Sequence, residues 1–355
     1  MNIEELKDRF KKESMVEDSY ELNKLIMNTI KEQKFIIYGG LAIDYLVRYA
    51  SNDMEFYYPK NTKKDFDVIG NEIEMKGDTE YIKGPFIDTI NLAKNIAKLG
   101  IKYIKIVTGL TGKTRKIFIN CEPEAIIDIS PRPTDGLETI QIGDMFIMDP
   151  QFLKVDQYQN LCFNLYNDYY RMEKAKKKLT LLEKHYPIDT VKFLLYKKEY
   201  VYDYGMNKDI VIDNDETVYG GDFVYYLYYK SDNKELRETI LYNNDMMTEI
   251  GKKELLYFPN YRILPMNGAT WYKEYNYKDK IIKICPKITL LYQYYDLLIK
   301  KRDHKCIKKI KTLLADSETM NLEGLMIHVP KNDMIKEYTV SMPTTWILEG
   351  KILNE

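Results

Sequence analysis

The sequence predicts an α+β fold built on a small mixed sheet, and three observations predict it. Between residues 34 and 150, short apolar runs typical of strands alternate with two amphipathic helical patterns. A diglycine joins the first apolar run to the first of these helices. From about residue 151 the pattern turns helical, and tyrosine-rich, strand-like segments return after residue 200.

These changes of pattern divide the chain into four segments. Residues 1–33 carry apolar side chains at near-helical spacing among charges, which predicts amphipathic helices. Residues 34–150 form the mixed domain, residues 151–200 a helical middle region, and residues 201–355 a last domain. A chain of 355 residues is long enough to bury a core in more than one such domain.

Each element of the mixed domain has a local signal in the sequence. Apolar runs bounded by glycine or proline predict the strands, and amphipathic spacing that stops near Gly100 predicts the second helix. Further along, residues 289–314 read as one helix. In the mixed domain we expect helices at 41–50 and 85–100, and strands at 35–38, 63–70, 101–107, 116–120 and 124–130.

Composition limits the classes of function. The formal net charge is −1, so any nucleic-acid binding must come from local basic patches. The four cysteines lie far apart without CxxC pairs and there are only three histidines, which argues against zinc and for a reducing compartment. The first residues are highly charged and no apolar run approaches 18 residues. We therefore expect a soluble, cytoplasmic protein, neither secreted nor membrane-spanning.

The segment Asp65-Phe66-Asp67 is the central chemical signal. On a strand, alternate side chains share a face, so the two carboxylates project together and repel each other. A third carboxylate, Asp128, stands alone in the apolar run AIIDIS, where its neighbours should face the other way. If the two strands are adjacent, three carboxylates converge and could hold two Mg²⁺ or Mn²⁺ ions roughly 3.5–4 Å apart.

The diglycine Gly39-Gly40 has two readings. Taken alone, it is best explained as a structural turn. Together with the carboxylates, it predicts a seat for triphosphate oxygens, because glycine lets phosphates approach the backbone N–H groups that begin the next helix. Asp-x-Asp is likewise common in surface loops, but the ordered set of glycines and carboxylates favours a catalytic site over a satisfied structural cluster or a degenerate enzyme.

Gly39, Gly40, Asp65, Asp67 and Asp128 resemble the motif of the nucleotidyltransferase superfamily that includes DNA polymerase β-like enzymes. Within it, YGGLAID, DFDV and DYYRMEKAKKKLTLLEK are similar to the poly(A) polymerase catalytic subunits of large cytoplasmic DNA viruses, of poxvirus and giant-virus type. The likeness covers about residues 35–185. It implies a nucleotidyltransferase catalytic domain at 34–150 and, at 201–355, the degenerate nucleotidyltransferase-like domain that this family carries.

The resemblance also implies an activity: template-independent addition of AMP from ATP to RNA 3′ ends by two-metal-ion phosphoryl transfer. Asp65, Asp67 and Asp128 would be catalytic and metal-binding, and Gly39 and Gly40 would bind the nucleotide. Arg171 and Lys174, which share a helix face with Lys178, could neutralise the β- and γ-phosphates, and Lys154 could also contact the nucleotide. The alternative for these basic residues is a solvated helix face.

The partners implied are ATP, an RNA 3′ end, and either a second copy of the chain or a cap-methylating, processivity-type subunit. Basic runs at 112–116, 171–178 and 299–311 could follow an RNA backbone, with tyrosines nearby for stacking. The virion or a viral factory is an alternative location within the cytoplasm. Two other functions stay open: a nucleotidyltransferase with a tRNA, small-molecule or protein acceptor, and a catalytically silent RNA-binding or assembly subunit.

A faint internal repeat connects the two halves. YGGLAIDYL at 38–46 is echoed by YGGDFVYYL at 219–227, and IIDISP at 126–131 by IIKICP at 281–286. Chance similarity in a chain rich in tyrosine, isoleucine and lysine is the alternative. If the repeat is genuine, Lys283 takes the place of Asp128, and the second copy has lost its carboxylate.

Overall fold

The structure is a computed structural model, and its chain divides into two compact units. The first comprises residues 1–153 together with 338–355, and the second comprises residues 154–337. The structure describes residues 20–52, 57–58, 65–71, 74–76, 80–83, 85–109, 114–120, 124–132, 137–162, 169–188, 218–229, 240–242, 270–277, 280–321, 323, 326–328, 344–348 and 351–354.

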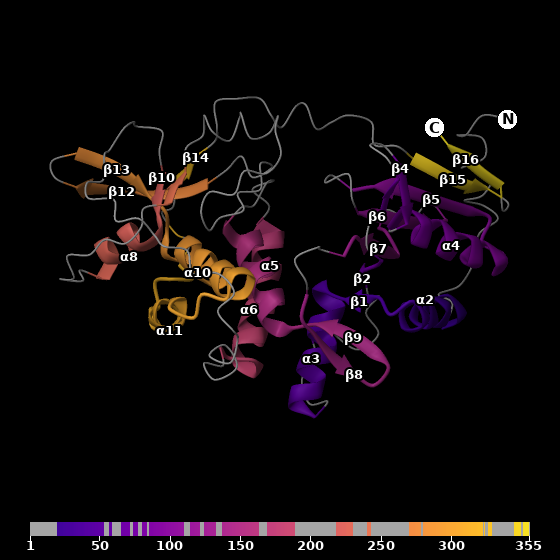
Figure 1. The fold of residues 1–355 in the computed structure, drawn as a ribbon, viewed down its shortest axis with the longest axis horizontal. Coiled ribbons are helices and arrows are strands. Elements are labelled where there is room, and N and C mark those ends of the chain that lie inside the picture. Colours follow the sequence, from indigo (N-terminus) through magenta and orange to yellow (C-terminus); the bar gives the residue numbers. More distant parts are fainter. Residues whose placement is uncertain are drawn as a thin grey trace. The chain divides into compact units, whose positions relative to one another are not determined.

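The first unit is built on a mixed sheet, to which nine of the described strands belong. Their order is β16-β15-β5-β6-β7-β2-β1-β9-β8 (Figure 1). The two pairings that matter for function are β2 with β7, which is parallel, and β6 with β7, which is antiparallel. The strands are β1 (Ile36–Ile37), β2 (Phe66–Ile69), β5 (Tyr103–Thr108), β6 (Arg115–Ile119), β7 (Ile127–Ser130), β8 (Thr139–Ile142), β9 (Met145–Met148), β15 (Thr344–Leu348) and β16 (Lys351–Asn354); β3 (Glu74–Lys76) and β4 (Glu80–Lys83) form a separate pair.

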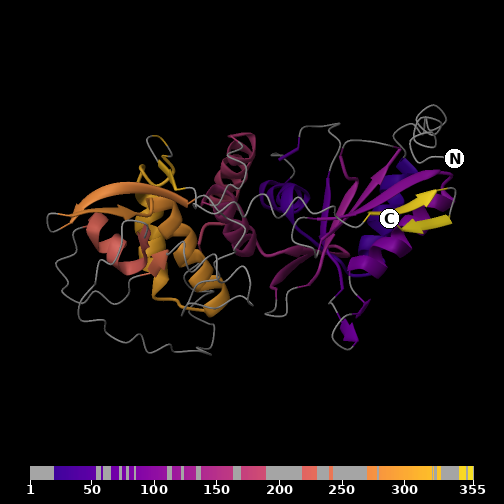
Figure 2. The ribbon, with the colours of Figure 1, turned by 90° about the horizontal axis from the view of Figure 1, so that it is seen from above.

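The last two strands return from the end of the chain to this sheet. β15 pairs antiparallel with β5, from Thr344 opposite Val107 to Leu348 opposite Tyr103, and β16 forms the outer edge. Figures 1 and 2 show these yellow strands beside the purple strands of the first unit. Residues 338–355 thus belong to the first unit, through the pairing of β15 with β5, while the domain bounds expected from the sequence stay a prediction.

Among the described helices, three cover the first sheet. α2 (Tyr20–Glu32) buries one face through Leu22, Ile26 and Ile30. α3 (Gly39–Ser51) is buried over most of its first two turns and contacts β2 and β9. α4 (Pro85–Lys98) packs on β5, β6, β7 and β15. These helices lie close to their expected positions, whereas the β8–β9 hairpin had not been expected.

The second unit combines helices with a smaller sheet, whose described strands have the order β11-β10-β13-β12-β14. The helix expected at 289–314 is two helices, because Arg302 takes a left-handed conformation (φ 56°) that ends the first of them. The elements are α5 (Pro150–Cys162, which begins in the first unit), α6 (Tyr169–His185), β10 (Val218–Gly220), α8 (Gly221–Tyr229), β11 (Ile240–Tyr242), β12 (Thr270–Tyr277), β13 (Lys280–Ile284), α10 (Lys287–Lys301), α11 (Cys306–Ala315) and β14 (Met326–His328).

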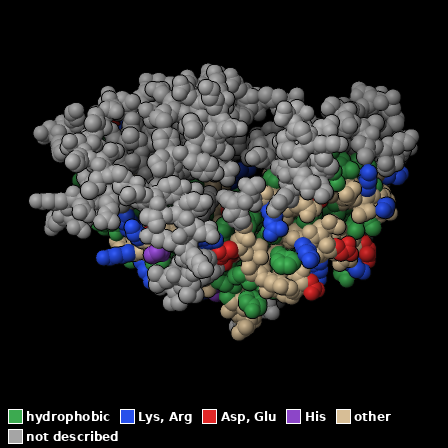
Figure 3. All heavy atoms as spheres, viewed as in Figure 1, with side chains coloured by type: hydrophobic (Ala, Val, Ile, Leu, Met, Phe, Trp, Pro, Cys, Tyr) green, Lys and Arg blue, Asp and Glu red, His purple; other side chains and the backbone are tan. Residues whose placement is uncertain are grey.

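The surface charges, the hydropathy of the helices and the state of the cysteines can be compared with what the composition indicates. On the face shown in Figure 3, basic and acidic side chains of the described residues are interspersed. Among the helices of the described residues, none has both the length and the hydropathy that crossing a membrane requires. Cys162, Cys285 and Cys306 are buried free thiols, and Cys121 lies outside the described residues.

Candidate active site

The diglycine connects β1 to α3, as expected, and each glycine has a packing reason. Gly39 has a φ of +66°, a left-handed conformation that residues with a side chain rarely adopt. A Cβ atom added to Gly39 would overlap the carboxylate of Asp67, and one added to Gly40 would overlap the hydroxyl of Tyr58. The backbone here is therefore close to an acidic side chain and a phenol, while the predicted seat for phosphates stays a prediction.

Gly39→Ala is expected to cost about 1–2 kcal/mol of unfolding free energy through its left-handed backbone and also to displace Asp67. Nucleotide transfer should then fall by much more than stability alone explains. The matched control is Gly143→Ala, because Gly143 has a similar φ of +58° but no atom within 4 Å of an added Cβ. Chemical denaturation and an RNA-extension assay on both variants make the test. Equal activity of the two would contradict a role for the Gly39–Asp67 contact.

Two of the three predicted carboxylates lie side by side. Asp67 on β2 is directly opposite Asp128 on the parallel strand β7. Paired residues of adjacent strands project to the same face, so both carboxylates leave the sheet together. The burial pattern agrees: Asp128 is half-buried, whereas its neighbours Ile127 and Ile129 are buried on the opposite face.

Asp65 lies just before β2 and acts electrostatically on the same group. Burial raises the pKa of the Asp128 carboxyl, the ion pair with Lys116 opposes this shift, and the negative charge of Asp65 adds to it. The Asp65 carboxylate is therefore close enough to Asp128 to repel it. The three acidic residues share one electrostatic environment.

Lys116 is a residue of this site that the sequence did not reveal. It lies on β6 directly opposite Asp128, and its ammonium donates a hydrogen bond to Oδ2 of that carboxylate. Lys116 also ends the basic run 112–116, which from the sequence could follow an RNA backbone. Only the β6–β7 register brings Lys116 to Asp128, and the register between two strands has no signal within either strand.

The side chains do not form a ready-made metal centre. Among the described residues, no group of three or more His, Cys, Asp or Glu side chains is arranged to hold a metal ion. The β2–β7 pair brings Asp67 and Asp128 together, but Asp128 is engaged by Lys116. Carboxylate oxygens are nevertheless the donors that Mg²⁺ and Mn²⁺ prefer, so these residues fit a divalent cation once Asp128 leaves the lysine.

A buried carboxylate fixes the segment that covers the diglycine. Asp44, only 1% exposed, accepts hydrogen bonds from the backbone N–H groups of Tyr57 (3.0 Å) and Tyr58 (3.1 Å). Its second oxygen pairs with Arg48 at 2.9 Å. Burial, followed by the charge of Asp65, raises the pKa of the Tyr58 phenol well above its usual value. Tyr58 is therefore a neutral hydroxyl beside the acidic residues.

Further hydroxyl groups line the same face of β7. Ser130, two residues after Asp128, shares hydrogen bonds with the hydroxyls of Tyr38 (3.1 Å) and Thr114 (2.9 Å). Tyr38 also donates its backbone N–H to the carbonyl oxygen of Asp67 at 2.9 Å. These contacts tie β1, β2 and β7 together around the two carboxylates.

The predicted basic residues all lie in the second unit. Lys154 is fully buried, and its ammonium lies 2.7 Å from Glu183 Oε2 and 2.6 Å from the carbonyl oxygen of Tyr186. This environment supports a structural role for Lys154 and gives no support to nucleotide binding. On α6, Arg171 is exposed and Lys174 half-buried, and their role toward the nucleotide stays a prediction.

Comparisons with known proteins find that part of the chain is similar to poly(A)-synthesising enzymes. More narrowly, residues 24–167 match the family described as poly(A) polymerase catalytic subunit, which confirms the resemblance noted in the sequence. The proteins of this family are polynucleotide adenylyltransferases.

Individual relatives agree with the family match. A candidate poly(A) polymerase catalytic subunit of African swine fever virus (isolate Pig/Kenya/KEN-50/1950) is 25% identical over 176 residues, 47% of this chain and 33% of that protein. The corresponding protein of Acanthamoeba polyphaga mimivirus is 23% identical over 313 residues, 80% of this chain and 49% of that protein. The chain thus matches between a third and a half of the length of these relatives.

A solved structure supports the fold. The Megavirus polyadenylate synthase superposes with a TM-score of 0.52 and 16% identity, covering 88% of this chain and 72% of that one. At this identity the likeness concerns the fold, and it agrees with the mixed α+β architecture.

Proposed function

We propose that the protein is a template-independent poly(A) polymerase that transfers AMP from ATP to the 3′ end of RNA. The observation that carries the proposal is the register of Asp67 opposite Asp128 on parallel strands, beside the glycine-initiated helix α3. The family match at residues 24–167 adds independent support. ATP as substrate and RNA as acceptor are part of the proposal.

Each acidic residue has a role in this reaction. Bound Mg²⁺ or Mn²⁺ would neutralise charge on the triphosphate and on the departing pyrophosphate. Asp65 and Asp67 would hold these cations, and Asp128 would hold a cation and help remove the proton from the RNA 3′-hydroxyl. The 3′ oxygen then forms a bond to the α-phosphorus of ATP as the bond to pyrophosphate breaks. Placement and charge account for most of the rate increase.

The second unit is proposed to be a degenerate copy of the catalytic sheet. In the first unit Lys116 on β6 is opposite Asp128 on β7. In the second unit Glu274 on β12 is opposite Lys283 on β13, so the same antiparallel arrangement carries the two charges reversed. β10 also leads through Gly221, at φ +63°, into α8. A lysine at the position of the carboxylate supports a scaffold role for this unit.

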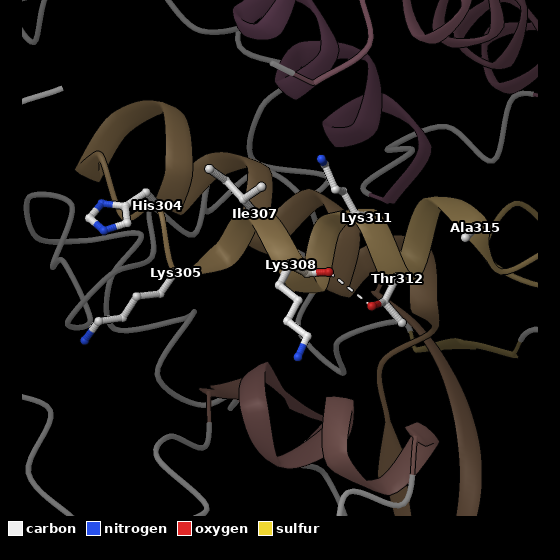
Figure 4. Close-up of a pocket in the computed structure, with 7 residues that line it drawn as sticks. All are labelled: His304, Lys305, Ile307, Lys308, Lys311, Thr312 and Ala315. Carbon is white, nitrogen blue, oxygen red and sulfur yellow. Dashed lines mark hydrogen bonds between the residues drawn. The ribbon is translucent and has the colours of Figure 1, made fainter. Parts of the chain in front are cut away.

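A basic groove on α11 supports RNA binding by the second unit. The groove has a volume of about 640 Å³, and Figure 4 shows Lys305 and Lys308 projecting to one side of the helix and Lys311 to the other. All three are exposed, and α11 contains no acidic residue. Within the described part of the chain, none of their ammonium groups has a carboxylate partner. Phosphates of a single strand are ligands that would neutralise them.

Replacing Lys305, Lys308 and Lys311 together by glutamine is expected to weaken RNA binding by about tenfold at 0.1 M salt. The slope of log affinity against log salt should fall by about 2, since each lost contact with a single strand contributes about 0.7. Fluorescence anisotropy with labelled oligo(A) measures both quantities. Glutamine at Lys24, Lys94 and Lys98, three exposed lysines of the first unit, is the matched control. An unchanged slope in the α11 variant would exclude this surface.

One experiment tests the proposed activity against its alternatives. Purified protein is incubated with labelled RNA, Mg²⁺ or Mn²⁺, and each nucleotide in turn. Extension of the 3′ end with ATP supports the proposal, and absence of extension with every nucleotide excludes it. Transfer to tRNA, a small molecule or a protein instead would identify another nucleotidyltransferase. Metal-dependent ATP binding that disappears in Asp65→Ala and Asp67→Ala would count against a catalytically silent subunit.

A further inference from the structure

We propose that Lys116 is a resident counter-ion for Asp128 that a divalent cation must displace, so that the lysine sets how readily the site accepts metal. The inference rests on the proposed function, because it assumes that Asp128 is a metal ligand. It assigns Lys116 a positioning role, since it acts on the chemistry only through Asp128.

The geometry places the Lys116 ammonium on the Asp128 carboxylate. The two residues are opposite each other on neighbouring strands, and the ammonium donates to Oδ2 of Asp128. The Asp128 side chain is 18% exposed and that of Lys116 is 38% exposed, so the pair lies where the sheet opens to solvent. The adjacent cation, Arg115, lies instead over the Phe86 ring, 5.8 Å from its centroid.

Electrostatics explains why a cation is needed at this position. Asp128 is opposite Asp67, and the charge of Asp65 also acts on it. Partly buried carboxylates repel one another at such short separations, unless a positive charge lies between or beside them. Lys116 provides that charge from the protein itself. A bound divalent cation would provide it from solution, and the ammonium and the cation would then compete for the same carboxylate.

Competition has a measurable consequence. A ligand that shares its carboxylate with a lysine must first break that ion pair, so its apparent affinity is reduced by the stability of the pair. Removing the ammonium while keeping the length of the side chain should therefore tighten metal binding. It should also make the metal-free protein less stable, because the acidic residues then lack a counter-charge.

The test uses Mn²⁺ alone as the probe. Titration of the full chain, followed by electron paramagnetic resonance of free Mn²⁺, should show about fivefold tighter binding in Lys116→Met than in the parent. Lys116→Arg, which keeps the charge, should restore parental affinity within about twofold. Thermal unfolding adds a second readout: the melting temperature of Lys116→Met should be lower without Mn²⁺, and its increase on adding Mn²⁺ should be larger than in the parent.

The second unit provides the control. Lys283 belongs to the corresponding strand pair with the charges reversed: it takes the position of Asp128 and is opposite Glu274, with its ammonium 5.4 Å from the Tyr272 ring centroid. Lys283→Met should leave Mn²⁺ affinity unchanged. Equal or weaker Mn²⁺ binding by Lys116→Met, together with binding that still depends on Asp67, would overturn the role of Lys116 and leave the proposed function standing. Absence of any Asp67-dependent Mn²⁺ binding in the parent would remove both.

Discussion

Asp67→Asn is expected to lower the rate of adenylate addition to RNA by at least about 10³-fold, while the fold stays intact. The asparagine has the same shape, so it still fits against Gly39, but it lacks the negative charge that binds a divalent cation. Loss of one charge-stabilising group in an enzyme site commonly costs this much or more. The measurement is single-turnover extension of a labelled RNA, and circular dichroism verifies the fold.

The companion variants make this result specific. Asp128→Asn should show a comparable loss, because it faces Asp67 across the β2–β7 pair. Asp144→Asn is the control, because its side chain is 84% exposed in the β8–β9 turn and its only described ion pair, with Lys31, is long at 3.9 Å. Unchanged turnover in Asp67→Asn or in Asp128→Asn would show that the altered residue has no part in catalysis.

Lys154→Met is expected to lower the free energy of unfolding by about 3 kcal/mol. The Lys154 ammonium lies at the centre of a buried network: it contacts Glu183 Oε2, while Glu183 Oε1 accepts hydrogen bonds from Tyr158 (2.6 Å) and Tyr295 (3.1 Å). Burial raises the pKa of both phenols well above the usual value, so they donate as neutral hydroxyls. Without the lysine, the Glu183 charge loses its ionic partner.

A second substitution separates this structural role from nucleotide binding. Glu183→Gln in the Lys154→Met background removes the uncompensated charge and should recover more than half of the lost stability, as measured by urea denaturation. The KM for ATP should change little in the stable double variant. A large rise in KM with parental stability would restore Lys154 as a nucleotide ligand and contradict the structural role.

Local patterns in the sequence were enough to predict the strand-to-helix turn at Gly39 and the outward position of Asp128. Two-residue alternation in DFDV and AIIDIS predicted which carboxylates share a face, and the diglycine predicted the strand-to-helix turn. The strand–turn–helix around Gly39 and the outward position of Asp128 follow from these signals. Such features depend on a few consecutive residues, and so they can be read without knowing the fold.

Features that depend on contacts between separate strands and helices could not be predicted in this way. Lys116 meets Asp128 through the β6–β7 register, and Asp44 holds Tyr57 and Tyr58 through hydrogen bonds to their backbone. Lys154 looked like a basic residue available to a nucleotide, yet tertiary packing buries it. The break at Arg302 was hidden because the residues on both sides favour helix.

The return of β15 to the first sheet affects how the protein is made. One of the two neighbours of β5 is the segment Thr344–Leu348, which the ribosome adds only after the whole second unit. At about 5–20 residues per second, β5 would wait roughly 10–50 s for its neighbour, with an open strand edge throughout. During translation, a second nascent chain could pair wrongly with the unpaired edge of β5. A chaperone could bind at the same edge.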